Sequence, residues 1–335
     1  MNNLRALATF SVVVLHVSFP LLCEYGVTKN NDWQIGNFFD SAVRFCVPIF
    51  LMLTGALLLA KPIEIESFFK KRFLKILLPF LFWSSIYVVY GLNLKYDKGE
   101  ILNFLESFKF VYLQFKDGAS YHLWYIYMLI GLYLFFPILN KWVLNSEEKE
   151  IRYFIIFWFF VMLVKQPYLC KFIPAIDLTY FSGYIDYLVL GYYLAFKFNY
   201  KKIKLLSVLI YVVGFGFTFL GTAFKTIHQG NVYTIFYDYL SPNVIIEAIG
   251  VFLFFKSFSF QNTKLESLID IVSKHSYGIY LSHVLMLTIL YKLGITYSFI
   301  NPFIAIPLTS ILCMILSLSF IVLLKKVPFI NSFIG

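Results

Sequence analysis

Long apolar runs recur along almost the whole chain, separated by short segments that contain charged residues, proline or glycine. Each run is close to the roughly 20 residues that an α-helix needs to cross the hydrocarbon core of a bilayer. The composition agrees, since 60% of the residues are hydrophobic and only 14% are charged, against about 25% charged in a typical soluble domain. The sequence therefore predicts an all-α integral membrane protein, built as a polytopic bundle of transmembrane helices.

We predict ten transmembrane helices, which together form a single domain over residues 1–335. Their approximate limits are residues 4–23, 37–59, 73–93, 122–140, 152–168, 179–197, 204–222, 242–257, 273–292 and 299–324. The connection between residues 94 and 121 is the longest and is polar enough to be solvated. No A-x-A cleavage site follows the first apolar run, so we interpret that run as a retained helix and not as a signal peptide.

The charged residues indicate an orientation and argue against nucleic acid as a partner. The net charge is +10, but most lysines lie in short loops between apolar runs, as the positive-inside rule describes. Of the 28 lysines and arginines, eighteen lie on the side that would hold both termini and nine on the other, with Arg44 inside a span. We therefore predict that both termini are cytoplasmic. The four cysteines lack CxxC spacing, so we expect no metal site.

The first span carries two ionisable residues, Arg5 and His16, which are eleven positions apart. At about 100° per residue this separation is roughly 20° more than three full turns, so both side chains project from one helix face, about 16 Å apart along the axis. Ionisable side chains inside a span usually face the bundle interior or a wet cavity. His16 therefore either bonds a neighbouring helix or acts as a general base, which a neutral imidazole can do.

Further ionisable residues lie in other predicted spans or at their ends. They are Asp40, Arg44, His122, Asp186, Glu247 and His283. Asp40 and Arg44 are four positions apart and can meet on one helix face, either as an ion pair at the membrane rim or as part of a site. Asp186 is expected near the middle of the sixth span and His283 near the middle of the ninth. We expect several of these side chains to converge on one cavity in the outer half of the membrane.

The third span begins with a basic cluster in the sequence FFKKRFLKILLPF, residues 68–80. The cluster contains Lys70, Lys71, Arg72 and Lys75, and the last two share a helix face because they are three positions apart. Two interpretations remain open. The cluster is either an anchor that binds lipid headgroups or a clamp for the phosphates of a cytosolic anion, which arginine can grip with two parallel hydrogen bonds.

Five stretches of the sequence, in order along the chain, share their pattern with one known family. Arg5 and His16 match an Arg-x10-His motif in that family's first helix. The stretch RFCVPIFLMLTG, residues 44–55, is similar to the second-helix pattern, although Ile49 and Thr54 stand where the family has phenylalanine and serine.

The remaining three stretches lie at the start of the third span and in two later spans. KKRFLKILLPF is similar to the family's R-x-x-R opening of the third helix, with Lys75 in place of the second arginine. HLWYIYMLIGLYLFFPIL (residues 122–139) and SYGIYLSHVLML (residues 276–287) are similar to two further signatures. Over nearly its whole length, the chain thus resembles the acyltransferase 3 family of integral membrane acyltransferases.

The resemblance implies transfer of an acyl group, commonly acetyl, from cytosolic acetyl-CoA or another acyl-CoA to a sugar hydroxyl. Family acceptors include lipopolysaccharide, capsule, peptidoglycan, lipid-linked glycans and macrolides. We expect no hydrolase-like extracellular domain, so the chain is similar to the stand-alone type, such as the O-acetyltransferases of enterobacterial common antigen and capsule. The expected location is the bacterial cytoplasmic (inner) membrane, and the expected partners are the glycan acceptor and membrane lipids.

The resemblance and the chemistry of the residues together suggest roles in the site. The CoA phosphates are expected to bind Arg72, Lys75 and Lys71. Arg5 is expected along the route of the pantetheine arm, while His16 takes the proton of the acceptor hydroxyl or briefly carries the acyl group. Arg44 is expected to stabilise the oxyanion. The expected acceptor-binding residues are His122, Trp124, Asp186 and His283.

Two other classes of function are compatible with the sequence. One is a polysaccharide exporter or flippase-type transporter, because intramembrane His, Arg and Asp also suit proton relays. Transporters often contain inverted repeats, and the sequence shows none. The other is a membrane scaffold, which would need neither Arg5 and His16 on one face nor a basic cluster below them. A homo-oligomer is also compatible with the sequence.

Overall fold

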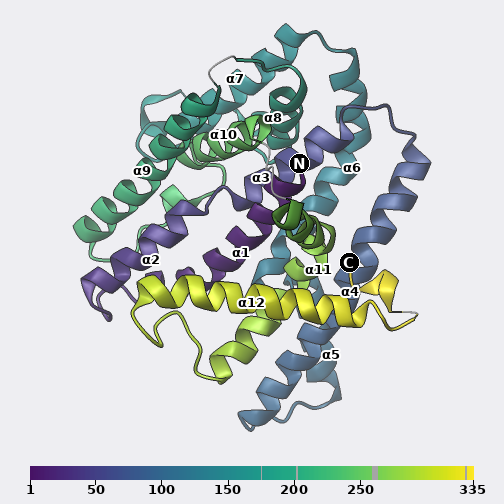
Figure 1. Cartoon of the computed structure of the whole chain (residues 1–335), viewed down its shortest axis with the longest axis vertical. Coiled ribbons are helices and arrows are strands. Elements are labelled where there is room, and N and C mark those ends of the chain that lie inside the picture. Colours follow the sequence, from purple (N-terminus) through teal and green to yellow (C-terminus); the bar gives the residue numbers. More distant parts are fainter. Residues whose placement is uncertain (175, 201–202, 259–262, 329) are drawn as a thin grey trace.

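The computed structural model describes the chain apart from residues 175, 201–202, 259–262 and 329. Within the described residues the secondary structure is helical and contains no β-strand, as the apolar runs predict. The α-helices (Figure 1) are α1 (Asn2–Cys23), α2 (Asn30–Ala42), α3 (Cys46–Leu58), α4 (Ile65–Asp97), α5 (Phe104–Asp117), α6 (Trp124–Asn145), α7 (Glu148–Val164), α8 (Ile185–Phe196), α9 (Ile203–Gln229), α10 (Pro242–Ser257), α11 (Thr263–Lys292) and α12 (Pro302–Leu324). Short 3-10 helices occupy Tyr121–Leu123, Cys170–Phe172, Thr179–Phe181, Ile235–Tyr237 and Asn331–Phe333.

Seven helical segments of the described chain are long and apolar enough to cross a membrane. They are α1, α2 together with α3, α4, Tyr121–Asn145, α9, Ile235–Ser257 and α12. Three predicted spans correspond to helices outside this set: α7 has 17 residues, α8 has 12, and α11 begins with a polar stretch. The chain is therefore a multi-pass, all-helical membrane protein, and the count of ten crossings stays a prediction.

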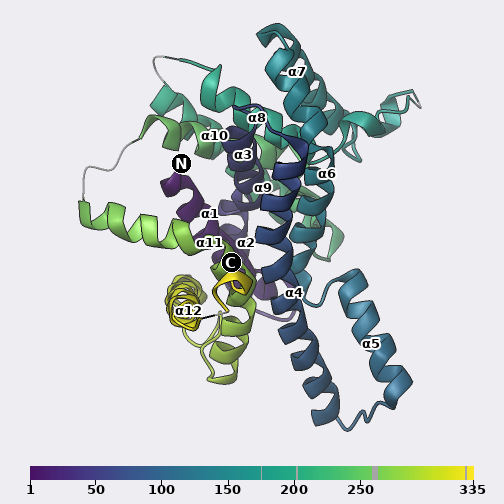
Figure 2. The same ribbon diagram turned by 90° about the vertical axis from the view of Figure 1, so that its right-hand side faces the viewer.

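Several predicted segments differ in the structure, and the second span, residues 37–59, is divided between α2 and α3. Residues 179–197 begin with a 3-10 turn and α8 starts only at Ile185, so the expectation that Asp186 lies in mid-span is wrong. Asp186 lies in the first turn of α8, where the positive end of the helix dipole favours a carboxylate. The connection 94–121 is not a loop throughout, because α4 continues to Asp97 and α5 packs back against it. Figure 2 shows this hairpin projecting beyond the neighbouring helices.

Close helix approach depends on glycine where α3 crosses α8. A Cβ on Gly55 would collide with the main chain of Leu188, and a Cβ on Gly191 would collide with the main chain of Met52. Small residues at such crossings let two helix backbones touch, which is how membrane helices gain packing energy. These two glycines therefore bring the twelve-residue α8 directly against α3.

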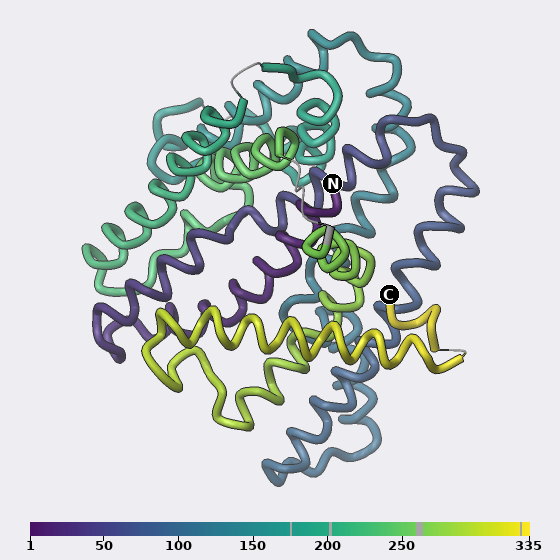
Figure 3. The backbone as a smooth tube through the Cα atoms, viewed as in Figure 1, coloured from purple at the N-terminus to yellow at the C-terminus, as the bar shows by residue number. Residues whose placement is uncertain are grey.

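Helix α1 runs through the middle of the bundle (Figure 3) and is largely buried. It packs against α11, and residues later in α1 contact residues later in α11. These contacts are Asn2 with Asp270, Arg5 with Ser273 and His16 with His283. The two helices therefore run parallel, and Arg5 and His16 share the face of α1 that meets α11, as their spacing predicts.

Candidate active site

A cavity of about 790 Å³ lies between α1, α3, α4, α6 and α11. We call it the basic cavity, because five cationic side chains line it: Arg5, Arg72, Lys75, Lys274 and Lys325. The exposed Lys75 and Lys274 mark its mouth, and the buried Tyr125 and Tyr280 form its inner end. Its volume falls in the range of about 300–1,000 Å³ that is typical of ligand sites. Five cations around one cavity favour a ligand with several phosphate groups.

The basic cavity contains part of the predicted phosphate clamp and two cations that the prediction missed. Arg72 and Lys75 both line it, but Lys71 is exposed and is not part of the lining. Lys274 and Lys325 complete the cavity from α11 and from the residue that follows α12. In the sequence they look like ordinary topology anchors at span ends, so only the packing of α11 and α12 against α1 and α4 identifies them.

Residues from both ends of the chain line the same cavity. Arg5 contributes from α1, and Asn331, Ser332 and Gly335 contribute from the segment after α12. The Arg5 Nη1 donates a hydrogen bond of 3.4 Å to the Ser273 Oγ, which holds the guanidinium at the wall between α1 and α11. Placement of residues 5 and 335 on one side of the bundle is what an even number of membrane crossings requires.

Three imidazoles meet beyond the inner end of the basic cavity. The rings of His16 and His283 stack with their centroids 5.2 Å apart, and His122 lies 5.0 Å from His283 and 6.4 Å from His16. Tyr121 joins the group, with its ring 5.0 Å from that of His16. These four residues, which we call the imidazole cluster, come from α1, α11 and the 3-10 turn that precedes α6. The structure brings His16, His122 and His283 together, as predicted, while their place in the outer half of the membrane stays a prediction.

Hydrogen bonds fix the orientation of two of these rings. The His283 Nδ1 donates to the Tyr280 carbonyl at 2.6 Å, since a carbonyl can only accept, and this leaves Nε2 as the acceptor nitrogen. The His122 Nδ1 lies 3.0 Å from the Ser120 Oγ. The Nε2 atoms of both histidines are buried and have no hydrogen-bond partner. The described side chains include no set of three His, Cys, Asp or Glu that could hold a metal ion.

Tyr280 connects the two parts of the site. Its ring lines the basic cavity and lies 5.5 Å from His122 and 5.9 Å from His283, and its hydroxyl donates to the His122 carbonyl. On the other side of the cluster Tyr121 is 62% exposed. His16 itself is only partly buried, whereas His122 and His283 are buried. Tyr280 lies in the signature stretch SYGIYLSHVLML, three positions before His283, but it was not among the predicted site residues.

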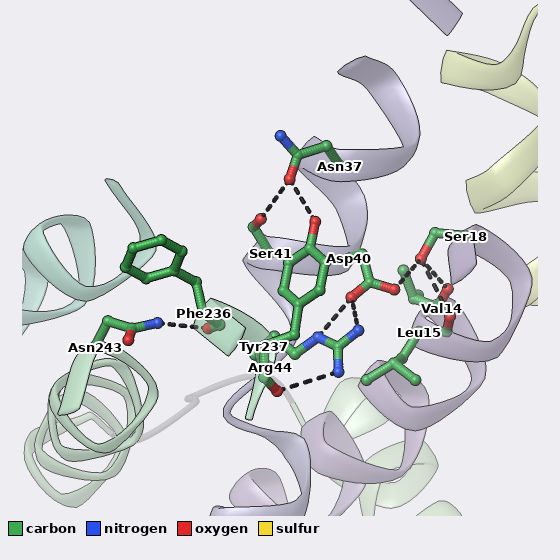
Figure 4. Close-up of polar contacts among 10 residues, drawn as sticks. All are labelled: Val14, Leu15, Ser18, Asn37, Asp40, Ser41, Arg44, Phe236, Tyr237 and Asn243. Atoms are coloured by element: carbon green, nitrogen blue, oxygen red, sulfur yellow. Dashed lines mark hydrogen bonds and ion pairs between the residues drawn. The ribbon is translucent and has the colours of Figure 1, made fainter. Parts of the chain in front are cut away.

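Arg44 lies at the break between α2 and α3, where it contacts residues outside the imidazole cluster (Figure 4). Its guanidinium forms an ion pair with Asp40, donates to the Tyr237 carbonyl at 3.3 Å and lies 4.2 Å from the centre of the Tyr237 ring. Asp40 in turn accepts from the Ser18 hydroxyl at 3.4 Å. The predicted contact of Asp40 with Arg44 is confirmed. Arg44 makes no hydrogen bond or ring contact with the imidazole cluster, and its contacts join α1, α2 and the turn before α10. Its expected role in stabilising the oxyanion stays a prediction.

Two further predicted site residues lie outside the cluster. Trp124 is 38% exposed, and its ring stacks on Tyr239 at 5.8 Å and lies 6.0 Å from Tyr184. Asp186 is buried at the start of α8, and neither carboxylate oxygen has a hydrogen-bond partner. Glu247 is likewise buried, on α10. The expected convergence of these acidic residues with the histidines is therefore not seen as direct contact.

Comparison with known proteins gives one match. The model of a family described as an acyltransferase domain matches residues 1–324. No curated protein and no solved structure matches the chain. The matched range contains the imidazole cluster and four of the five cations of the basic cavity, and Lys325 directly follows it.

Proposed function

The chain belongs to the acyltransferase family whose model covers nearly all of it, and from this premise we propose that it is a membrane O-acyltransferase that uses acyl-CoA, with acetyl-CoA as the expected donor. The observation that carries the proposal is the basic cavity, whose inner end meets the imidazole cluster through Tyr280. A donor with phosphates at one end and a thioester at the other fits a site with cations at one end and proton acceptors at the other.

The donor binds with its phosphates among the five cations of the basic cavity. Arg5 and Arg72 can each grip a phosphate with two hydrogen bonds, whereas the lysines act as point charges. The pantetheine arm then follows the cavity between α1 and α11 towards Tyr125 and Tyr280, which brings the thioester next to the imidazole cluster. We propose that this side is the cytoplasm, because CoA is cytosolic and the positive-inside rule gives the same orientation.

His16 acts on the acceptor hydroxyl. It is the least buried of the three histidines and lies beside the exposed Tyr121, so an acceptor can reach it from the side opposite the donor. Its imidazole takes the hydroxyl proton as the oxygen attacks the thioester carbonyl. The carbon–sulfur bond then breaks, the acyl group stays on the acceptor, and the proton passes to the departing CoA thiolate. The Nε2 atom of His283, which has no hydrogen-bond partner, is proposed to accept a hydrogen bond from the acceptor, and the unpartnered Nε2 of His122 offers a second polar contact.

The acceptor is proposed to be a cell-surface or lipid-linked glycan. Tyr121 of the imidazole cluster and Trp124, two positions after His122, are exposed aromatic side chains, and such rings offer an apolar face with a polar edge, as sugar binding requires. The proposed location is the cytoplasmic membrane of a bacterium, where both a cytosolic thioester and a lipid-linked glycan are within reach.

A donor assay with the purified protein tests the proposal. Protein in lipid vesicles is incubated with acetyl-CoA that carries a label on the acetyl group, together with a glycan extract. Release of free CoA thiol and transfer of the label to the glycan are expected. Movement of glycan across the vesicle membrane without thiol release would instead identify a transporter. An absence of both signals in vesicles that retain folded protein would contradict the proposal.

A further inference from the structure

Three aromatic rings close the inner end of the basic cavity, and their position suggests what limits the length of the donor's acyl group. We propose that Phe50, Tyr125 and Tyr280, which we call the aromatic stop, set the length of the acyl group that the site accepts and make it selective for short acyl thioesters. This inference rests on the proposed function, since it assigns the acyl specificity of the same site.

The aromatic stop is a continuous set of ring contacts. Phe50 on α3 lies 6.2 Å from Tyr125 on α6, and Tyr125 lies 5.6 Å from Tyr280 on α11. All three line the basic cavity, and both tyrosines are only 8% exposed. Three different helices thus place one ring each at the point where the cavity ends.

The Tyr280 ring is held in place by a hydrogen bond. Its hydroxyl donates to the His122 carbonyl, and its ring also lies 5.5 Å from the His122 ring and 5.9 Å from the His283 ring. A displacement of this ring would break that hydrogen bond. The basic cavity ends at the three rings, so the acyl tail of a thioester bound there packs on them. A longer tail finds protein in its way, and close-packed protein interiors accept extra methylene groups poorly.

Replacing one aromatic side chain of the aromatic stop with a smaller aliphatic side chain tests the inference. The variants are Tyr125→Leu and, at the neighbouring ring, Phe50→Ala. The matched control is Tyr133→Leu, which removes the same group from a buried tyrosine on the same helix that lines the same cavity two turns away. Each protein receives equal concentrations of acetyl-CoA and hexanoyl-CoA, and mass spectrometry measures the ratio of acetylated to hexanoylated product. This ratio does not depend on the fraction of protein that is active.

The wild-type protein is expected to favour acetyl by at least about tenfold, the lower limit for discrimination of one methylene in a hydrophobic pocket. Tyr125→Leu or Phe50→Ala is expected to shift the ratio towards hexanoyl by about tenfold or more, while Tyr133→Leu keeps the wild-type ratio. Equal use of both donors by the wild type would overturn the inference, as would an unchanged ratio in either stop variant. Failure of the proposed function has a different signature, because the wild type would then acylate nothing with either donor.

Discussion

Arg5 and His16 serve different parts of the site although they lie on one face of α1. Arg5 lines the basic cavity, and His16 belongs to the imidazole cluster. The eleven-residue spacing separates them by about 16 Å along the helix, and the parallel packing of α11 supplies Lys274 beside the first and His283 beside the second. One helix pair therefore places cations of the basic cavity and histidines of the imidazole cluster at a fixed separation.

Arg72 provides the sharpest residue-scale prediction for the basic cavity. Arg72→Ala is expected to raise the KM for acetyl-CoA about tenfold or more, because a hydrogen bond to a charged group contributes about 1.5–3 kcal/mol. Lys71→Ala removes a neighbouring charge that is exposed and outside the cavity lining, so it serves as the control. Steady-state kinetics across a range of donor concentrations measures both effects. Equal changes in KM for the two variants would show that surface charge alone attracts the donor.

Local helix geometry can be predicted from single residues, whereas long-range contacts cannot. The Arg-x10-His spacing predicts that both side chains share one face of their helix, because helix periodicity is a local property, whereas only the structure shows that this face meets α11. Of the two contacts of Arg44, only one can be predicted from the sequence. Asp40 lies four positions before Arg44, whereas Tyr237 lies in a turn nearly two hundred positions away. Tyr280 lies in the signature stretch at residues 276–287, but its contacts with the basic cavity and with His122 are tertiary and could not be predicted from that stretch.

At the scale of elements, α9 and α10 pack through Gly214. A Cβ there would lie 2.6 Å from the Glu247 backbone nitrogen, whereas a Cβ on Gly216 meets no atom within 4 Å. Gly214→Ala is therefore expected to lower the melting temperature in detergent, because overpacking typically costs about 1–3 kcal/mol. Gly216→Ala makes the same change of helix propensity on the same helix without the clash, so it should melt at or above the wild-type temperature. A Gly214→Ala protein as stable as Gly216→Ala would refute this packing.

Element type was easier to predict than element limits. Apolar runs indicate helices wherever they occur, and each predicted span has a helix in the described chain. Hydropathy does not reveal that the second span breaks into α2 and α3 at Val43–Phe45, or that α8 has only twelve residues. Both features are accompanied by contacts with distant segments: Arg44 at the break contacts Tyr237, and α8 packs on α3 through glycines.

At the scale of the whole molecule, residues near both termini line one cavity, so both termini are expected on the side from which the donor enters. Epitope tags at residues 1 and 335 test this in sealed vesicles of known orientation. Protease added on the cytoplasmic side should remove both tags, and protease added on the other side should remove neither. Cleavage of the two tags from opposite sides would mean an odd number of crossings and would contradict the shared cavity.

The most direct test of the proposed reaction is the acyl-transfer rate of His16→Ala at saturating acetyl-CoA, with donor binding measured on the same preparation. His16 lies outside the basic cavity lining, so donor binding should stay within about threefold of wild type. Loss of a general base is expected to lower the rate of transfer by about 10²- to 10⁴-fold. A His16→Ala protein that binds donor normally and transfers acetyl at the wild-type rate would contradict the proposed chemistry.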